Sequence, residues 1–300
     1  MENTNGNSTF AVIKPAASSN FVETPFVKGL IERAMAYLKA GFPVHLLGPT
    51  GSGKTTLALH ISEMIGRPAM LIYGDDEFGT SDLIGNDNGY SRRRTVDNYI
   101  HSVLKVEESV NHNWVDNRLT VACREGYTLI YDEFTRSRPE ANNALLSVLA
   151  ERVLVLPAGQ GRKGYIKVHP EFRAVFTSNP IEYVGTHQTQ NALLDRMITI
   201  HIPSLDQDTE AAIAAAHSGL DMADASQVIK TIHLVRDGGI VSGPPSVRAA
   251  IMICRILAVG GHQPKADDHV FVQTCIDVLN LQTIEQQYQF MDLLRGSSDA

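Results

Sequence analysis

The sequence is poor in the residues that mark secreted, metal-stapled and membrane-spanning proteins. Only three cysteines occur in 300 residues, Cys123, Cys254 and Cys275, and they form no CxxC pair. Disulfide frameworks and zinc clusters need more cysteines at closer spacing, so we expect reduced thiols and a cytoplasmic protein. No run of 18 apolar residues occurs, and the first 20 residues lack the basic and apolar regions of a secretory signal.

Positive charge is also scarce. The chain has 26 lysines and arginines against 33 acidic residues, a net charge of -7. Nucleic acids and anionic membranes are bound mainly by clustered positive charge, so neither is an expected partner. The strongest basic run, the arginines at 92–94, is interpreted as a solvated loop or a contact between subunits. With 43% hydrophobic residues, the chain can still bury a substantial core.

Short apolar segments alternate with helical periodicity over the first two thirds of the chain. Strands are predicted at residues 43–47, 69–73, 127–131, 173–177 and 198–202. Segments with apolar residues every three or four positions lie between them. This alternation predicts an α/β fold with a five-stranded, mostly parallel sheet covered on both faces.

Two segments depart from simple alternation. The 53 residues between Tyr73 and Tyr127 are too many for one crossover helix. Their apolar spacing predicts an inserted helical element, with helices near 81–84, 96–104 and 114–124. Apolar segments at 153–156 and 165–168 flank a glycine-rich turn and predict a hairpin, whose tip at 159–164 either points into a ring pore or is a plain turn.

The pattern predicts three parts of the chain. Residues 1–20 are rich in Asn, Ser and Thr and are expected to form a disordered arm. Residues 21–204 form the α/β core. After Pro203 only helical periodicity remains, which predicts a smaller helical domain over residues 205–300.

The strongest chemical signal is the phosphate loop, residues 48–55, whose sequence Gly-Pro-Thr-Gly-Ser-Gly-Lys-Thr fits GxxxxGK[ST] between a predicted strand and helix. Its glycines let backbone N–H groups converge on an anion, and the helix N-terminus adds its dipole. Lys54 is placed to reach the β- and γ-phosphates of ATP, and Thr55 to bind Mg²⁺. The predicted nucleotide-binding residues are Gly48, Pro49, Thr50, Gly51, Ser52, Gly53, Lys54, Thr55 and Thr56.

Polar residues at other element ends complete a predicted ATPase site. Asp132, at the end of an apolar strand, can hold Mg²⁺, and Glu133 can take a proton from water. Asn179 follows the next strand, where it can orient that water. Arg196 and Arg248 can stabilise charge on the phosphates. An acidic turn, an Asn-Pro turn and surface ion pairs are the plainer alternatives, and the phosphate loop favours the catalytic interpretation.

The order of these motifs resembles the AAA+ ATPases. The insert and the hairpin before the Asn179 strand resemble the MoxR branch, and residues 21–300 resemble more narrowly the AAA+ ATPases of gas vesicles. The resemblance rests on residues 46–60, 115–126, 131–143 and 192–197. It implies an AAA+ fold with a helix-2 insert, a hairpin before the first sensor and a helical lid domain.

The resemblance also implies roles and partners. Asn179 would be the first sensor, Arg196 a finger given to a neighbouring subunit, and Arg248 a second sensor that serves its own nucleotide or a neighbour's. It implies a homo-oligomer, arranged as a ring, that hydrolyses Mg-ATP and acts on gas vesicle shell or accessory proteins in the cytoplasm. Phe21 and Val22 are at the family's adenine position.

Other functions stay open at this stage. A general MoxR-type chaperone would act on another protein client, and a nucleic-acid-dependent AAA+ motor would need a basic channel. A small-molecule kinase would leave the insert and Arg196 unexplained, and a nucleotide-gated scaffold would not need Glu133. Arg136 and Arg138 are predicted either at a subunit interface near the nucleotide or on the plain surface of a helix N-terminus.

Overall fold

The computed structural model describes residues 12–13, 21–97, 105–157, 164–180, 191–241, 243 and 245–298. The predicted disordered arm, apart from residues 12–13, and most of the predicted hairpin tip lie outside these residues. The chain divides into two compact units. The first unit comprises Met1–Pro15, Tyr37–His45 and Ser62–Thr199, and the second comprises Ala16–Ala36, Leu46–Ile61 and Ile200–Ala300.

A six-stranded sheet has the order β1-β3-β6-β9-β2-β10. Its strands are β1 (Val12–Ile13), β2 (Val44–Leu47), β3 (Ala69–Tyr73), β6 (Thr128–Asp132), β9 (Arg173–Ser178) and β10 (Ile198–His201). The strand β6 pairs in parallel with both β3 and β9, whereas β1 pairs antiparallel with β3 at the edge. The five predicted strands are thus confirmed, and β1 is an addition that the sequence pattern did not predict.

The two central strands, β6 and β9, are almost completely buried. All five residues of β6 are buried, as are five of the six in β9. A strand buried on both faces needs an uninterrupted apolar run, and Leu129-Ile130-Tyr131 provides one. The polar residue Asp132 follows that run and therefore lies where the strand leaves the core.

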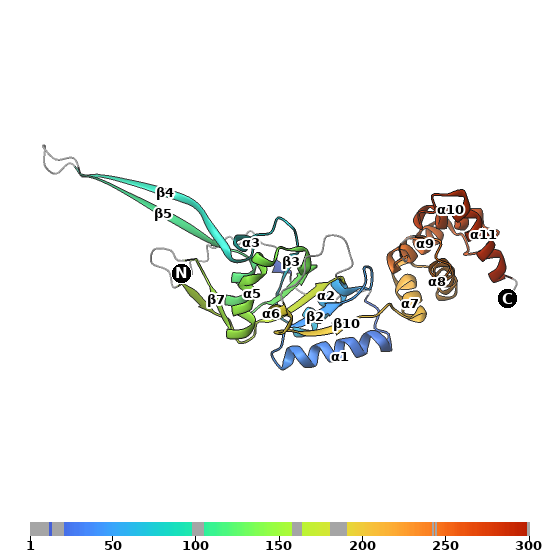
Figure 1. Ribbon diagram of the computed structural model, residues 1–300, viewed down its shortest axis with the longest axis horizontal. Helices are drawn as coiled ribbons and strands as arrows, with labels where there is room; N and C mark the ends of the chain where they lie inside the picture. The colour runs from blue at the N-terminus through green and yellow to red at the C-terminus, as the bar shows by residue number, and fades with distance from the viewer. Residues whose placement is uncertain are drawn as a thin grey trace. The chain divides into compact units, whose positions relative to one another are not determined.

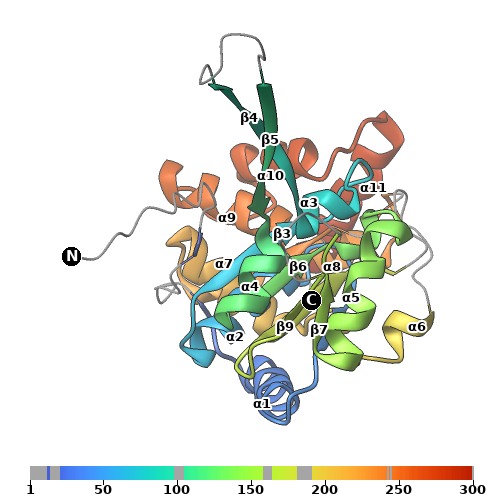
Figure 2. The same cartoon turned by 90° about the vertical axis from the view of Figure 1, so that its left-hand side faces the viewer.

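Of the helices of the first unit, α4 and α5 lie beside these strands (Figure 2). The helices are α3 (Thr80–Ile84), α4 (Arg118–Glu125), α5 (Pro139–Glu151) and α6 (Asn191–Leu194). Asn117 caps the start of α4, and Gly126 ends it in the left-handed conformation at φ 69°. Leu119, Leu129 and Leu145 belong to one buried apolar cluster, so α4 and α5 are held against β6 mainly by burial.

The helix predicted near 81–84 is confirmed as α3, but the insert between α3 and α4 is a long β-hairpin and not helical. Its strands β4 (Gly85–Asp97) and β5 (Lys105–Asp116) pair antiparallel and extend away from the sheet (Figure 1). The helix predicted near 96–104 is wrong at Val96, which is paired with Val106. The helix predicted to start at Trp114 begins instead at Arg118. Cross-strand pairing along the ribbon overrides the helical spacing of a few apolar residues.

The one hairpin that the sequence predicts, at 153–156 and 165–168, is confirmed. Its strands β7 (Val153–Val155) and β8 (Tyr165–Lys167) pair antiparallel between α5 and β9. Leu154 is buried in the same apolar cluster as Leu129, so the base of this hairpin is part of the core.

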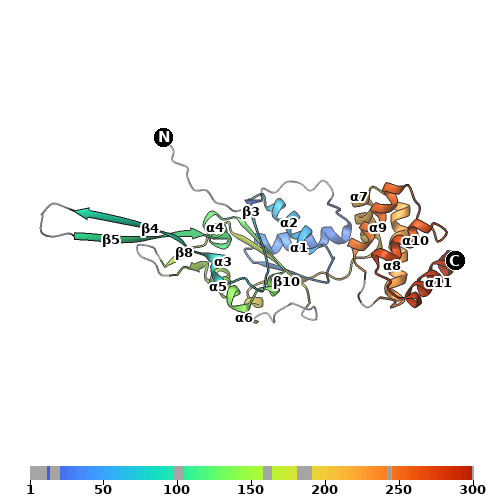
Figure 3. The same cartoon turned by 90° about the horizontal axis from the view of Figure 1, so that it is seen from above.

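The second unit contains the phosphate loop and the C-terminal helices. The C-terminal helices pack together (Figure 3). The second unit includes most of α1, most of α2 and all of α7–α11. Their bounds are α1 (Pro25–Lys39), α2 (Lys54–Ile65), α7 (Gln207–Ser218), α8 (Met222–Asp237), α9 (Val247–Gly260), α10 (His269–Val278) and α11 (Ile284–Ser298). The predicted all-helical C-terminal region is confirmed, and its boundary near Ser204 stays a prediction. Of the helices in the described residues, none has both the length and the apolar composition needed to span a membrane.

Candidate nucleotide-binding site

The phosphate loop has the backbone conformation that an anion cradle requires. Gly51 and Gly53 adopt φ values of +81° and +78°, which side chains other than hydrogen rarely allow. A Cβ on Gly51 would lie 2.5 Å from Cβ of Ser246, and one on Gly48 would lie 2.6 Å from the Ile202 carbonyl oxygen. The loop therefore requires glycine both for its turns and for its close packing within the second unit.

The side chain of Lys54 folds back over this loop. Its Nζ donates hydrogen bonds to the carbonyl oxygens of Gly48 (2.9 Å) and Pro49 (2.7 Å). Lys54 is also the first residue of α2, so its buried charge lies at the positive end of the helix dipole. An ammonium group with loop N–H groups fits phosphate, and the Thr55 hydroxyl and Asp132 carboxylate are oxygen donors of the kind Mg²⁺ prefers.

Asp132 and Glu133 are held by one hydroxyl group of the next strand. Oδ1 of the buried Asp132 accepts a hydrogen bond from Oγ1 of Thr177 at 2.5 Å. The same Oγ1 accepts the backbone N–H of Glu133 at 2.9 Å. Glu133 adopts the left-handed conformation (φ 51°, ψ 41°), and its carbonyl oxygen leaves no room for a Cβ on Gly74. These contacts fix the turn that carries both acids.

The carboxylate of Glu133 is paired with Arg136 in this structure. Its Oε2 lies 2.9 Å from Nη1 of Arg136, and the side chains are 37% and 55% exposed. The hydrogen bond and charge of Glu133 raise the pKa of Arg136, and the nearby Asp76 and Asp75 act in the same direction. An ion pair this exposed contributes little free energy, so the carboxylate can exchange partners readily.

The remaining predicted site residues are distributed over both units. Asn179 directly follows β9 in the first unit, as Glu133 follows the parallel strand β6. Arg196 is exposed after α6, and its Nη1 donates to the Ala192 carbonyl oxygen at 2.5 Å. Arg248 is an exposed residue in the first turn of α9, whose N-cap is Ser246. The structure thus groups Arg248 with the phosphate loop in the second unit, and Asn179 and Arg196 with the two acids in the first.

Comparison with known proteins identifies the family. The AAA domain family (dynein-related subfamily) matches residues 43–197. The chain is 50% identical to the gas vesicle ATPase GvpN of Ancylobacter aquaticus, over 91% of this chain and 77% of that protein. The chain belongs to the GvpN family of gas vesicle ATPases. A GvpN of Haloferax mediterranei is 42% identical, over 86% of this chain and 74% of its own length.

Membership of the GvpN family confirms the predicted AAA+ class, nucleotide binding and ATPase activity. A solved structure of the Thermotoga maritima RuvB Holliday junction branch migration motor superposes with a TM-score of 0.52 at 17% identity, covering 89% of this chain and 73% of that one. At that identity the likeness shows the AAA+ fold alone.

Phe21, predicted with Val22 to touch adenine, stacks on the ring of His60 in this GvpN-family chain. The ring centroids are 3.8 Å apart with an interplanar angle of 6°. Glu23 lies 3.2 Å from Nε2 of the same histidine. These contacts attach the segment before α1 to α2, and the adenine contact itself stays a prediction.

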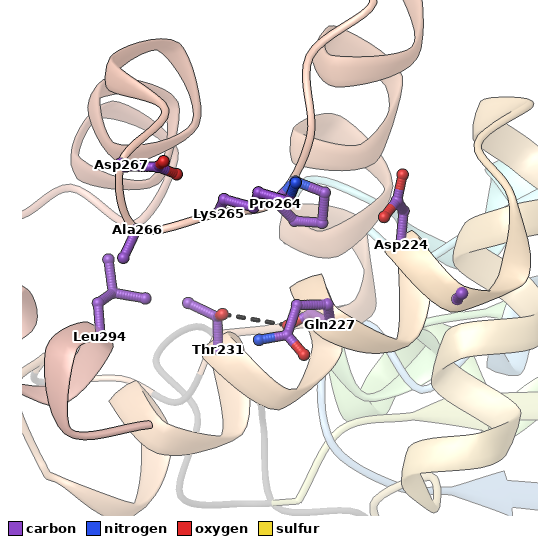
Figure 4. A pocket seen from close by; sticks show the side chains of 9 residues that line it. Asp224, Gln227, Thr231, Pro264, Lys265, Ala266, Asp267 and Leu294 are labelled. Carbon is purple, nitrogen blue, oxygen red and sulfur yellow. Dashed lines mark hydrogen bonds between the residues drawn. The ribbon is translucent and has the colours of Figure 1, made fainter. Parts of the chain in front are cut away.

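A cavity of about 600 Å³ in the helical region of the GvpN-family chain is not the nucleotide site (Figure 4). Asp224, Gln227 and Thr231 of α8 line one side, and Lys265 and Leu294 line others. Burial, followed by the charge of Asp221, raises the pKa of Asp224. The cavity includes no residue of the phosphate loop and neither of the two acids, so its volume alone is no guide to the chemistry.

One residue that contacts both acids escaped the sequence analysis. Thr177 was part of the strand segment before Asn179, but only Asn179 was assigned a role. The feature that could have drawn attention to Thr177 is a hydroxyl group one residue after Phe176, at a strand position that is fully buried. Threonine is common in strands, so that signal does not identify a function without knowledge of the strand pairing.

Proposed function

We propose that this chain binds Mg-ATP at the phosphate loop and hydrolyses it during gas vesicle formation, where it remodels or chaperones shell or accessory proteins. The observation that carries the proposal is the glycine-shaped loop before α2, with Lys54 over it, in a member of the GvpN family. Membership of the family supports the gas vesicle role, because the related proteins are named gas vesicle ATPases.

Each proposed residue has a distinct task. The loop N–H groups and Lys54 bind the β- and γ-phosphates, and Thr55 and Asp132 hold the magnesium ion. The metal, when bound, neutralises charge on the phosphates. Glu133 accepts a proton from the attacking water, which Asn179 orients. Because Glu133 is paired with Arg136, its carboxylate must leave that arginine before it can act as a base.

We further propose a homo-oligomer, arranged as a ring in the cytoplasm and associated with gas vesicles. The exposed Arg196 has a backbone carbonyl as partner and is therefore available to approach a neighbouring subunit's nucleotide. Arg248 lies beside Ser246, which packs on Gly51, so it serves either its own nucleotide or a neighbour's.

The test combines binding, turnover and vesicle formation. Lys54→Ala is expected to abolish ATP binding, because it removes the cation of the loop. Glu133→Gln is expected to retain binding but to lower turnover by about 10²- to 10⁴-fold, because the amide cannot accept the proton. Glu125→Gln, a change of an exposed acid at the end of α4, is the matched control and should behave as the unmodified chain.

Vesicle formation decides the biological part of the proposal. Cells with the complete gas vesicle gene set should lose buoyancy when this chain carries Glu133→Gln. Normal buoyancy with Glu133→Gln would show that turnover is dispensable and favour a nucleotide-gated scaffold. Normal buoyancy without the chain would instead favour a general chaperone with another client.

A further inference from the structure

The buried hydroxyl group of Thr177 connects the two acids of the site. Thr177 lies in β9, one residue beyond Phe176, which is paired with Tyr131 of β6. The parallel register therefore places Thr177 beside Asp132. Thr177 is fully buried, so its hydroxyl group must find hydrogen-bond partners within the protein.

The directions of its hydrogen bonds follow from the chemistry of the partners. A backbone N–H can only donate, so Oγ1 of Thr177 must be the acceptor of the Glu133 N–H at 2.9 Å. The hydroxyl proton is then left for Oδ1 of Asp132, which lies 2.5 Å away.

Each bond fixes one part of the site. The bond to Oδ1 sets the rotation of the Asp132 carboxylate and hence the direction in which its second oxygen points. The bond from the Glu133 N–H stabilises a left-handed residue, a conformation that glutamate adopts only at a cost in free energy. A methyl group in place of this hydroxyl would release both constraints and leave the Glu133 N–H without this acceptor.

We propose that Thr177 is a positioning residue of the magnesium site: its hydroxyl group orients Asp132 toward the metal and holds the Glu133 turn without touching the nucleotide. The inference rests on the proposed Mg-ATP site. Partners that orient metal-binding side chains typically change metal affinity or activity by about 10- to 100-fold when they are removed.

The neighbouring residue provides a matched control. Ser178 is also buried in β9, but its side chain points to the opposite face of the strand, where Oγ lies 2.8 Å from Nε2 of His45. Nδ1 of His45 is in turn 3.1 Å from Oγ1 of Thr199. Ser178→Ala therefore removes a buried hydrogen bond from the same strand without changing either acid's contacts.

The experiment compares Thr177→Val, Thr177→Ser and Ser178→Ala in the full chain. Binding of a fluorescent ATP analogue is measured first in EDTA and then along a Mg²⁺ titration. Thr177→Val, which keeps the size of the side chain, should bind the analogue in EDTA within about twofold of the unmodified chain. Its half-saturating Mg²⁺ concentration should rise about 10- to 100-fold. Thr177→Ser should restore a value within about threefold of the unmodified chain, because the hydroxyl is retained.

The control separates positioning from general stability. Ser178→Ala should lower the melting temperature but leave the Mg²⁺ midpoint unchanged. An equal shift of the midpoint in Ser178→Ala, or none in Thr177→Val, would overturn the inference. If Thr177→Val does not fold, Thr177→Ala is measured in the same way. If the unmodified chain shows no Mg²⁺-dependent binding at all, the proposed function fails and not only the role of Thr177.

Discussion

Two regions of the first unit, the ends of β6 and β9 and the β4–β5 hairpin, differ in how many neighbouring strands support them. The ends of β6 and β9 lie in the middle of a six-stranded sheet, where Asp132, Glu133 and Thr177 are fixed by buried hydrogen bonds. The β4–β5 hairpin, a few residues from α3 and α4, is a two-stranded sheet of its own. We expect a division of labour, in which the sheet performs the chemistry and the backbone edges of the two-stranded ribbon, which are open to strand addition, contact another protein.

Shortening the hairpin should have the largest effect of the changes considered, on vesicle formation, and almost none on ATP turnover. The change replaces residues 88–113 by Asn-Gly, which joins Asp87 to its cross-strand partner Trp114 through a two-residue turn. ATP turnover should stay within about twofold, because Trp114 keeps its hydrogen bond to Asp116 and the α4 core is intact. Vesicle formation should be lost, as measured by buoyancy.

A matched insertion provides the control for that experiment. Inserting two glycines between Asp97 and Lys105, which are paired across the ribbon, should preserve both turnover and buoyancy, because the paired strands are unchanged. Loss of turnover in the shortened chain would contradict the division between the two regions. Full buoyancy in the shortened chain would show that the client is bound elsewhere.

The reactivity of the Cys123 thiol should depend on the packing of the core and not on the hairpin. Cys123 lies in α4, fully buried, and burial raises its pKa to about 12 although Arg152 lowers it. At pH 8 its thiolate fraction should be about 10³-fold below that of an exposed cysteine, which ionises near pH 8.5. We expect labelling by a thiol reagent to be slower by at least that factor, and equally slow in the chain with the shortened hairpin.

The same pKa shift predicts a pH dependence of stability. The folded state keeps the Cys123 thiol neutral up to about pH 12, whereas the unfolded chain ionises near pH 8.5. The stabilisation is therefore complete below pH 8.5 and is lost as the pH rises toward 12, by at most about 1.4 kcal/mol per pH unit. Urea unfolding at pH 8 and pH 10 should show a smaller loss for Cys123→Ser, and an equal loss would contradict the assignment.

Hydrogen exchange should show a smaller difference between the two regions. Amide groups of β6 have paired strands on both sides, so they should exchange only when the core opens. Amide groups of β5 have one partner strand, and a two-stranded ribbon is only marginally stable by itself. We expect exchange in β5 at Val106–Val110 to be at least about 100-fold faster than at Leu129–Tyr131. Equal protection would show that the ribbon is held by further contacts.

The sequence predicts the central sheet better than the insert, because burial leaves a clearer residue pattern than pairing between two strands does. The continuous apolar run of β6 leaves little choice but a buried strand, and Asp132-Glu133 at its end marks the site. The phosphate loop is identified by spacing alone, because its glycines are needed for backbone conformation. In the insert, Val96 and later apolar residues also fit a helix, and only pairing with β5 decides for a strand.

The role of Thr177 lay beyond sequence reasoning for a related reason. Its hydroxyl group gains a function only through the parallel register that places it beside Asp132. Likewise, the ion pair of Glu133 and Arg136 depends on the left-handed turn at Glu133, which no residue pattern indicates. Pairwise geometry between elements is therefore the information that the pattern of residues lacks.

Removing the ion pair at Glu133 should have the smallest effect on stability and turnover. It would distinguish the contacts that fix the site from those that can exchange partners. Because both side chains are exposed, Arg136→Gln should change the free energy of unfolding by less than about 0.5 kcal/mol. The released carboxylate is a readier base, so turnover should rise about twofold, the factor that corresponds to that free energy. Salt should raise turnover of the unmodified chain by screening the pair, and should have no such effect on Arg136→Gln. As a control, Arg138→Gln removes the same charge at an exposed position two residues away and should leave turnover unchanged. A tenfold fall in the turnover of Arg136→Gln would contradict the prediction and show that Arg136 is required for catalysis.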